Sequence, residues 1–443
     1  MEKSIKYWIY ISVITACTIF LCFKQLKNNN WNRCISSDGK GYYVYLPAFF
    51  IYNDLQFQFV HQYETKYYKP GNTVDFTNKY DEKYVNKYWV GTAILMSPFF
   101  ATAHFFATLL KLPTDGYSFV YQMMIAIGAC FYLLLGLFFM RKLLLLYFCK
   151  EVEIFIALFA LVFATNLFYY TVAEPSMSHV YSMATMCAFA YYAKKYFETY
   201  TLKFLKLAAI LFAFIVLIRP SNAIVILALP FLAGSIKIFK EGFKNCKGIQ
   251  LISVLTLVVL IISIQFIYYK NAAGAFFVYS YGNEKFNFLN PHINDFLFSY
   301  RRGLFVYAPL LFLALFGFII LAKKSSFQTK ALAIFLIVII YVLSSWWMWY
   351  YGGGFGMRPM IDFYVFFSVP LALFIGYLLK VKSVKWIGLL AIVSCILIAQ
   401  IQTYQKVNFI LPWDGIDKEI YWKLFLKTDP AYIGKFTSEN HAQ

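Results

Sequence analysis

The sequence contains a succession of long apolar segments with few charges, and these limit the possible folds more than any other feature. Most are 16 to 24 residues long, the length that an α-helix needs to cross a bilayer, whereas a membrane β-strand needs about ten residues of alternating polarity. With 61% hydrophobic and only 14% charged residues, the chain differs from ordinary soluble domains. It is expected to be an all-α polytopic membrane protein with about 11 crossings. The expected spans are residues 7–23, 117–140, 152–172, 177–197, 203–218, 221–237, 249–268, 303–322, 329–348, 359–379 and 386–403.

Positive charge is in excess and lies beside the apolar segments. Lys and Arg number 40 against 21 Asp and Glu, which in a soluble chain would suggest nucleic acid as a partner. Next to membrane spans, anionic lipid head groups explain the excess more simply, and no nucleic-acid partner is expected. The eight Cys show no CxxC spacing, so the sequence predicts neither a disulfide framework nor a zinc site.

The basic loops indicate how the chain threads the membrane. Four of them, such as "RKLLLLYFCK" and "KIFKEGFKNCK", fall on one side together with the N-terminus only if segment 89–110 does not cross. Pro98 and His104 inside that segment favour a helix on the membrane surface or a re-entrant one. The N-terminus is then cytoplasmic and the C-terminus external. The expected parts are a signal anchor (1–23), an external loop with juxtamembrane helices (24–116), a helical bundle (117–403) and an external tail (404–443).

Asp38 is the most conspicuous residue of the expected external loop. It stands in "SSDGKG", directly after the first apolar segment and before a cluster of Tyr and Phe. Such an acid is often a loop residue or a helix cap. A carboxylate at an aromatic-rich membrane interface can also act as a general base toward a hydroxyl. In that case the neighbouring Lys40 and Tyr42 are expected to contact the substrate.

Two polar residues flank the turn between the third and fourth expected spans. Glu174 and His179 lie in "EPSMSH" at the outer ends of these spans, where a charge is costly unless it is paired, solvated or used. Glu174 is a candidate for substrate binding. His179 is either a hydrogen-bonded structural residue or a contact for a phosphate or an acceptor hydroxyl.

An arginine interrupts 35 nearly continuous apolar residues at "LIRPSN". Pro220 ends one helix, so the segment is either a tight hairpin with a snorkelling Arg219 or an anion site that combines this cation with a helix N-terminus.

A glycine run precedes another arginine in "YYGGGFGMRPMID". Arg358 and Asp362 are four residues apart and could pair along one helix face. Alternatively, the glycines let the backbone approach a phosphate that Arg358 neutralises. Arg301 and Arg302, just before another span, either orient that helix or hold a head group.

The order of these parts resembles that of the GT-C class of membrane glycosyltransferases, of the protein O-mannosyltransferase and aminoarabinose transferase kind. The likeness covers most of the chain: a signal anchor, a long external loop with an early Asp, a juxtamembrane helix, and a bundle with "LIRPSN" and "GGGFGMRP" turns. The resemblance implies a polyprenyl-phosphate sugar as donor and assigns the base role to Asp38. It leaves the phosphate-binding residue open among Arg219, Arg358 and the pair Arg301/Arg302.

The sequence therefore predicts an enzyme that transfers a sugar, with inversion, from a polyprenyl phosphate to a glycan, lipid or protein acceptor on the outer face. A bacterial inner membrane is the expected location. No cofactor is expected, and the few dispersed outer acids give no support for a divalent metal. The alternatives are a flippase or carrier of lipid-linked oligosaccharides, a polysaccharide polymerase or ligase, and a non-catalytic assembly or receptor protein of the envelope.

Overall fold

The computed structural model describes residues 2–23, 31–68 and 76–436 and is mostly helical, with 72% of the chain in helices. Parts of the expected external loop (24–30 and 69–75) and of the expected tail (437–443) lie outside the described residues. The helices are α1 (Glu2–Phe20), α2 (Gly39–Tyr43), α3 (Tyr45–Pro47), α4 (Val60–Tyr67), α5 (Gly91–Leu109), α6 (Phe119–Leu146), α7 (Glu151–Phe163), α8 (Leu167–Val172), α9 (Ser178–Thr199), α10 (Leu202–Ile218), α11 (Leu229–Ala233), α12 (Ile236–Asn245), α13 (Ile249–Ala273), α14 (Ile293–Phe298), α15 (Leu304–Tyr307), α16 (Pro309–Lys324), α17 (Ser326–Ser344), α18 (Tyr364–Lys380), α19 (Lys382–Val407) and α20 (Lys418–Leu424). Short 3₁₀ or π-helical turns are η2 (Trp31–Arg33), η3 (Ala48–Tyr52), η4 (Pro220–Ala228), η5 (Arg358–Phe363) and η6 (Pro430–Tyr432).

Among the described residues, six helical segments are long and apolar enough to cross a membrane. They are α5, α6, α13, α17, the continuous segment Arg358–Lys380 formed by η5 and α18, and α19. Segment Pro220–Ala233 and helix α12 form a further apolar pair that bends by 115° at its break. The apolar helical residues Tyr7–Phe23 in the first expected span are shorter. The total of about 11 crossings therefore stays a prediction.

Several expected spans are helical but broken by residues that end hydrogen-bonded turns. The span at 152–172 divides into α7 and α8, where Thr165 donates to the carbonyl of Leu161 (2.7 Å) and accepts from the Leu167 amide (3.2 Å). The span at 303–322 divides into α15 and α16 because Pro309 has no amide hydrogen to continue the first helix. Local polar and proline residues thus divide segments that the apolar pattern alone predicts to be continuous helices.

Helix α5, expected not to cross, is one of the six segments of sufficient length and hydropathy. It lies along the N-terminal half of α6, where His104 Nδ1 is 2.6 Å from the Tyr121 hydroxyl and Tyr132 donates to the Leu95 carbonyl (2.8 Å). Its aromatic end is exposed, with Phe105 63% accessible. Its non-crossing position stays a prediction.

The segment expected to be an external loop contains a small β-hairpin, so the all-α expectation is incomplete. Strands β1 (Thr77–Tyr80) and β2 (Lys83–Asn86) pair antiparallel, with Thr77 opposite Asn86. The two-residue turn is possible because Asp81 adopts a left-handed conformation (φ 51°), which suits the tight turn of a hairpin. The hairpin carries Lys87 and Tyr88 to the site described below.

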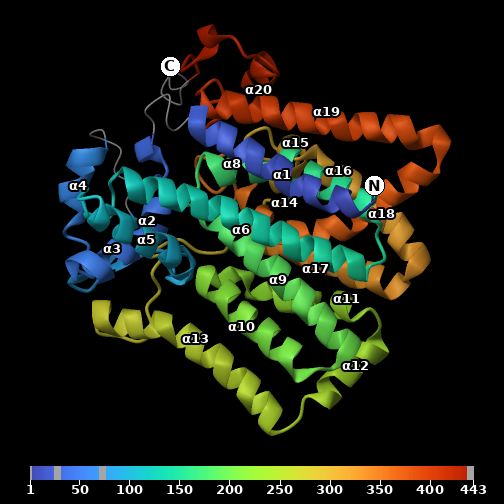
Figure 1. The fold of residues 1–443 in the computed structure, drawn as a ribbon, viewed down its shortest axis with the longest axis horizontal. Coiled ribbons are helices and arrows are strands. Elements are labelled where there is room, and N and C mark those ends of the chain that lie inside the picture. Colours follow the sequence, from blue (N-terminus) through green and yellow to red (C-terminus); the bar gives the residue numbers. More distant parts are fainter. Residues whose placement is uncertain (1, 24–30, 69–75, 437–443) are drawn as a thin grey trace.

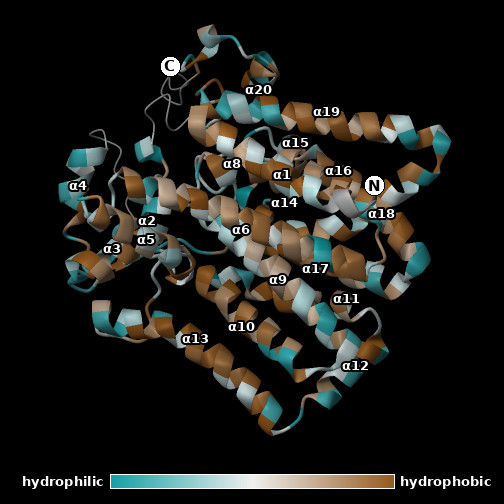
Figure 2. Cartoon of the chain, viewed as in Figure 1, coloured by the Kyte–Doolittle hydropathy of each residue, from teal (hydrophilic) through white to brown (hydrophobic). Residues whose placement is uncertain are grey.

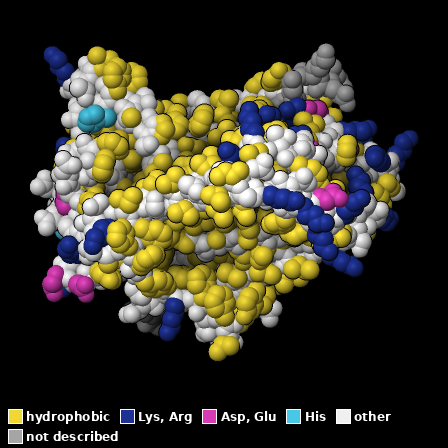
Figure 3. Space-filling model, turned by 90° about the horizontal axis from the view of Figure 1, so that it is seen from below, with side chains coloured by type: hydrophobic (Ala, Val, Ile, Leu, Met, Phe, Trp, Pro, Cys, Tyr) yellow, Lys and Arg dark blue, Asp and Glu magenta, His cyan; other side chains and the backbone are white. Residues whose placement is uncertain are grey.

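The two ends of the bundle carry different connecting segments (Figure 1). The short helices α2, α3 and α4 lie at its left end, and the bends around α11, α12 and the α18–α19 connection lie at its right end. Figure 2 shows apolar residues along most of the helices, and α13 and α19 keep apolar side chains exposed, such as Leu260 (61%) and Trp386 (72%). A belt of apolar side chains crosses the face in Figure 3, with many Lys and Arg gathered at its right end. Exposed apolar belts of this kind suit a lipid environment.

Candidate active site

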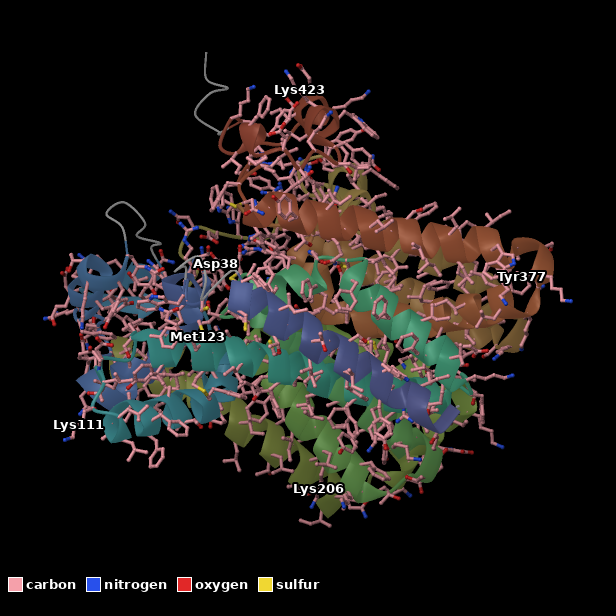
Figure 4. All side chains as sticks on the ribbon, turned by 45° about the horizontal axis from the view of Figure 1, so that its top comes forward. Asp38, Lys111, Met123, Lys206, Tyr377 and Lys423 are labelled. Carbon is pink, nitrogen blue, oxygen red and sulfur yellow. The ribbon has the colours of Figure 1, made fainter. Side chains whose placement is uncertain are left out.

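A cavity of about 620 Å³ lies where the segment before α5 meets the bundle. Three of the residues singled out in the sequence for the base and phosphate roles line it together: Asp38, Arg219 and Arg358. Figure 4 shows Asp38 beside the short N-terminal helices, on the opposite side of the bundle from Tyr377. Further lining residues come from segments that are distant in the sequence, namely Tyr42, Lys87, Tyr88, Ser221, Tyr281, Glu284, Trp346, Trp347, Tyr351, Gly353 and Trp413.

Asp38 stands at the N-terminus of α2, but its side chain does not cap the helix. The carboxylate instead accepts a hydrogen bond from Arg358 Nη2 at 2.8 Å, across 320 positions of sequence. The backbone directs it there because Ser37 is in the left-handed conformation and Gly39 packs directly on Ser176. A Cβ at Gly39 would overlap the Ser176 side chain, so the chain can approach this closely only with glycine. The structure therefore contradicts the helix-cap alternative for Asp38.

The environment of Asp38 keeps its carboxyl ionised. Burial raises its pKa, but the charges of Arg358 and then Lys87, with a hydrogen bond from Tyr88, outweigh that effect, so the pKa lies below its ordinary value. Lys87 is itself paired with Glu284, another residue of the cavity. Asp38 is thus a carboxylate held by a cation, and its ability to accept a proton depends on how firmly Arg358 is engaged.

Arg358 begins η5 directly after the glycine run. Gly352 and Gly356 have positive φ (69° and 59°), and the Arg358 side chain lies close to Gly352 and Gly354. The guanidinium therefore rests on backbone that has no side chains to cover it. The alternative in which Arg358 pairs with Asp362 along one helix face is wrong, because Arg358 pairs with Asp38 and Asp362 has other partners.

Arg219 follows α10 and is held by a buried acid. Its guanidinium donates to Ser178 Oγ (3.0 Å) and to the Tyr42 hydroxyl (3.4 Å) and lies 3.7 Å from Asp362 Oδ2. Asp362 is fully buried and also accepts from Asn222 Nδ2 at 2.6 Å. A buried carboxylate orients this cation, which leaves Arg219 at the cavity wall next to Ser221.

His179 is buried beside Asp362, and its contact with a phosphate or an acceptor hydroxyl stays a prediction. It is 1% exposed, and its Nδ1 is 3.1 Å from Asp362 Oδ1. It lies behind the cavity wall and does not line it. Its geometry supports the position of Asp362 and, through it, Arg219.

Glu174 and Lys40 also lie beside the cavity lining rather than in it. Glu174 accepts from the Tyr169 hydroxyl at 2.8 Å. Burial raises its pKa above the ordinary value, against the lowering effect of that hydrogen bond and of Arg358. Lys40 is buried, with its ammonium 4.1 Å from the centre of the Tyr68 ring. Substrate contact by either residue stays a prediction.

Arg301 and Arg302 are brought to the segment after α19 and not to the cavity lining. Arg301 forms a bidentate pair with Asp414 (2.9 and 2.7 Å), and Arg302, 1% exposed, donates to the carbonyl of Trp413. Their direct contact with a lipid phosphate, one of the sequence alternatives, stays untested. Arg302 thus contacts the cavity residue Trp413 directly, and Arg301 contacts its neighbour Asp414.

Sequence reasoning missed Lys87, Glu284, Asp362 as an anchor, and Trp413. Asp362 carried a signal, because an acid inside an apolar span needs a partner. Trp413 carried none, since nothing local relates it to Gly353, 60 positions earlier. Within residues 2–23, 31–68 and 76–436 no group of three or more His, Cys, Asp or Glu side chains could hold a metal ion.

Comparisons with known proteins give few matches. No protein-family model and no curated protein matches the chain. Among solved structures, the chain is similar to the apo crystal structure of the Archaeoglobus fulgidus oligosaccharyltransferase, with 14% identity, a TM-score of 0.47, and coverage of 96% of this chain and 60% of that one. It is also similar to the archaeal oligosaccharyltransferase AglB from Archaeoglobus fulgidus in complex with an inhibitory peptide and a dolichol-phosphate, with 13% identity, a TM-score of 0.48 and the same coverage. The chain thus spans about three fifths of the length of either structure.

Proposed function

We propose that the protein is a membrane glycosyltransferase of the GT-C class that moves a sugar from a polyprenyl phosphate to an acceptor hydroxyl on the outer face. One observation carries this proposal: a carboxylate, Asp38, and two guanidinium groups, Arg358 and Arg219, line one cavity at the end of an apolar bundle. A base beside two cations is the minimum that the reaction requires. One group takes a proton from the acceptor, and the others stabilise the departing phosphate.

Binding of the donor phosphate prepares the base. The phosphate accepts hydrogen bonds from Arg358 and Arg219, which are bidentate donors well suited to such an anion. Arg358 is then shared between the phosphate and Asp38, so its hold on the carboxylate weakens. The pKa of Asp38 rises from its lowered value toward the ordinary one, and the carboxylate becomes a better proton acceptor.

The chemical step is a single displacement. Asp38 accepts the proton of the acceptor hydroxyl as the hydroxyl oxygen bonds to the anomeric carbon. The bond from that carbon to the phosphate oxygen breaks, and its electron pair leaves with the phosphate, whose charge the two arginines neutralise. Attack from the side opposite the leaving group inverts the anomeric configuration. The acceptor is a glycan, a lipid or a protein hydroxyl.

The charge distribution supports an outer-face site. Cytoplasmic loops of membrane proteins are enriched in Lys and Arg, and many of these residues gather at the end of the bundle away from Asp38 (Figures 3 and 4). The proposed arrangement has 11 crossings, a cytoplasmic signal anchor and α5 on the membrane surface. The protein O-mannosyltransferase and aminoarabinose transferase kind is the proposed subtype, and a bacterial inner membrane the proposed location.

The test is Asp38→Asn in proteoliposomes supplied with radiolabelled polyprenyl-phosphate sugars and outer-face acceptors. Loss of a general base is expected to lower transfer by about 10²- to 10⁴-fold. Asp81→Asn, an exposed acid of the same external loop, serves as the matched control and is expected to retain transfer. Full transfer by Asp38→Asn would refute the base role, and movement of the lipid-linked sugar across the bilayer without any transfer by the wild type would identify a carrier.

A further inference from the structure

Trp413 comes from the C-terminal part of the chain and forms part of the cavity wall. Its side chain lines the cavity and packs on Gly353, where an added Cβ would overlap the indole ring. Even so, the residue remains 60% exposed. Exposure alone does not distinguish this residue, because Trp386 and Trp422 are also exposed. Its place in the cavity lining, against the glycine run that also contacts Arg358, does. One side of the indole packs on the Gly353 backbone, and much of the rest of its surface is exposed.

Three cations hold the turn that carries Trp413. Arg301 pairs with Asp414, and Arg302 donates to the Trp413 carbonyl. Lys406 donates to the carbonyls of Pro412 (3.0 Å) and Trp413 (3.1 Å). Arg302 and Lys406 are 1% and 6% exposed, and burying cations is costly unless their hydrogen bonds are well made. The turn is therefore held rigidly, and the exposed indole has a defined position.

The indole of Trp413 and the guanidinium of Arg358 pack against the same short glycine segment. Arg358 lies against Gly352 and Gly354, and Trp413 lies against Gly353 between them. The guanidinium and the indole therefore contact consecutive residues of one backbone segment, which is the arrangement that a sugar linked to a phosphate on Arg358 would need to contact the indole. One face of a pyranose carries several C–H groups, which pack favourably on the negative face of an aromatic ring.

We propose that Trp413 is the binding platform for the sugar ring of the donor, and that Arg301, Arg302 and Lys406 are positioning residues that hold this platform. The inference rests on the proposed function and deepens it, because it names the part of the cavity that recognises the sugar. The ligand class is a pyranose attached to a lipid phosphate.

The experiment separates recognition of the sugar from recognition of the phosphate. Binding to the full-length protein in detergent is measured for undecaprenyl phosphate and for its glucose, mannose and galactose conjugates. The wild type is expected to bind at least one conjugate more tightly than undecaprenyl phosphate. Trp413→Leu is expected to lose this preference, about tenfold in affinity, while its affinity for undecaprenyl phosphate stays unchanged. Trp413→Phe keeps an aromatic face and is expected to retain most of the preference.

Trp422→Leu is the matched control, because Trp422 is an exposed tryptophan (54%) of the same segment that does not line the cavity. The inference is overturned if the wild type binds all four lipids equally, or if Trp413→Leu weakens all of them equally or none. If undecaprenyl phosphate still binds and requires Arg358 in these cases, the proposed function survives without the sugar platform. If the wild type binds no lipid phosphate, both fall.

Discussion

Removing the proposed base is expected to tighten the binding of the donor's phosphate. In the structure, Arg358 donates to Asp38 at 2.8 Å, so a lipid phosphate must compete with this carboxylate for the guanidinium. Asp38→Asn removes both the competitor and a negative charge that repels the phosphate. The variant should therefore bind undecaprenyl phosphate more tightly than the wild type, although it no longer transfers sugar.

The size of the gain follows from the geometry of the pair. With nitrogen and oxygen 2.8 Å apart, the two charge centres are about 4 Å apart, which corresponds to about 4 kcal/mol of attraction at an effective dielectric constant of about 20. Water reduces this value because 26% of the Asp38 side chain is exposed. We expect about 1.4 to 2.7 kcal/mol to be recovered, which is about a 10- to 100-fold tighter dissociation constant.

The assay is equilibrium binding of undecaprenyl phosphate to the purified protein in detergent, at low and high salt. Asp81→Asn is expected to leave affinity unchanged, because Asp81 is exposed at the hairpin turn. Arg358→Gln should weaken binding. In the Arg358→Gln background, Asp38→Asn removes only the repulsion between the carboxylate and the phosphate, since no guanidinium remains for the two to compete for. Equal or weaker binding by Asp38→Asn alone would refute the competition between carboxylate and phosphate.

Four further outcomes are expected. Asp362→Asn leaves Arg219 without its buried counter-ion, so we expect a loss of about 3 kcal/mol in unfolding free energy, measured by denaturation in mixed micelles; an unchanged stability would contradict the role of Asp362 as an anchor. Because the pKa of Asp38 is lowered, kcat/KM of transfer should fall on the acid side only as pH drops below the ordinary Asp range. Lys87→Gln removes one of the charges that lower this pKa, so the acid limb should move to higher pH, and a shift to lower pH would disprove the assignment. Gly39→Ala should reduce transfer by displacing Asp38 from Arg358, and Ser176→Gly in the same chain should restore part of it, since the added Cβ meets the Ser176 side chain.

The fold class was readable from the sequence because it depends on local composition. Long apolar segments must be helical in lipid, since every backbone polar group has to be bonded within its own segment. The structure is accordingly mostly helical, with six segments long and apolar enough to cross. The positions at which the helices break were harder to predict from the sequence. Thr165 ends a turn through its side-chain hydrogen bonds. Its single hydroxyl hardly changes the mean hydropathy of the segment, so the sequence pattern did not reveal the break.

The sequence also identified which residues are unusual, because a charge at the end of an apolar span needs an explanation. It did not identify their partners. Asp38 and Arg358 are 320 positions apart, and Asp362 reaches Arg219 instead of the arginine four residues before it.

The sequence by itself thus determined the class of protein and the set of candidate charged residues, since both follow from residue type and local spacing. Only the tertiary structure decided that Asp38 faces Arg358, that His179 lies behind the wall, and that Arg301 and Arg302 hold Trp413 over Gly353. The physical reason is that an ion pair or a ring contact depends on the distance between side chains in space. Helix packing and loop geometry set that distance, and neither is encoded within any short stretch of the chain.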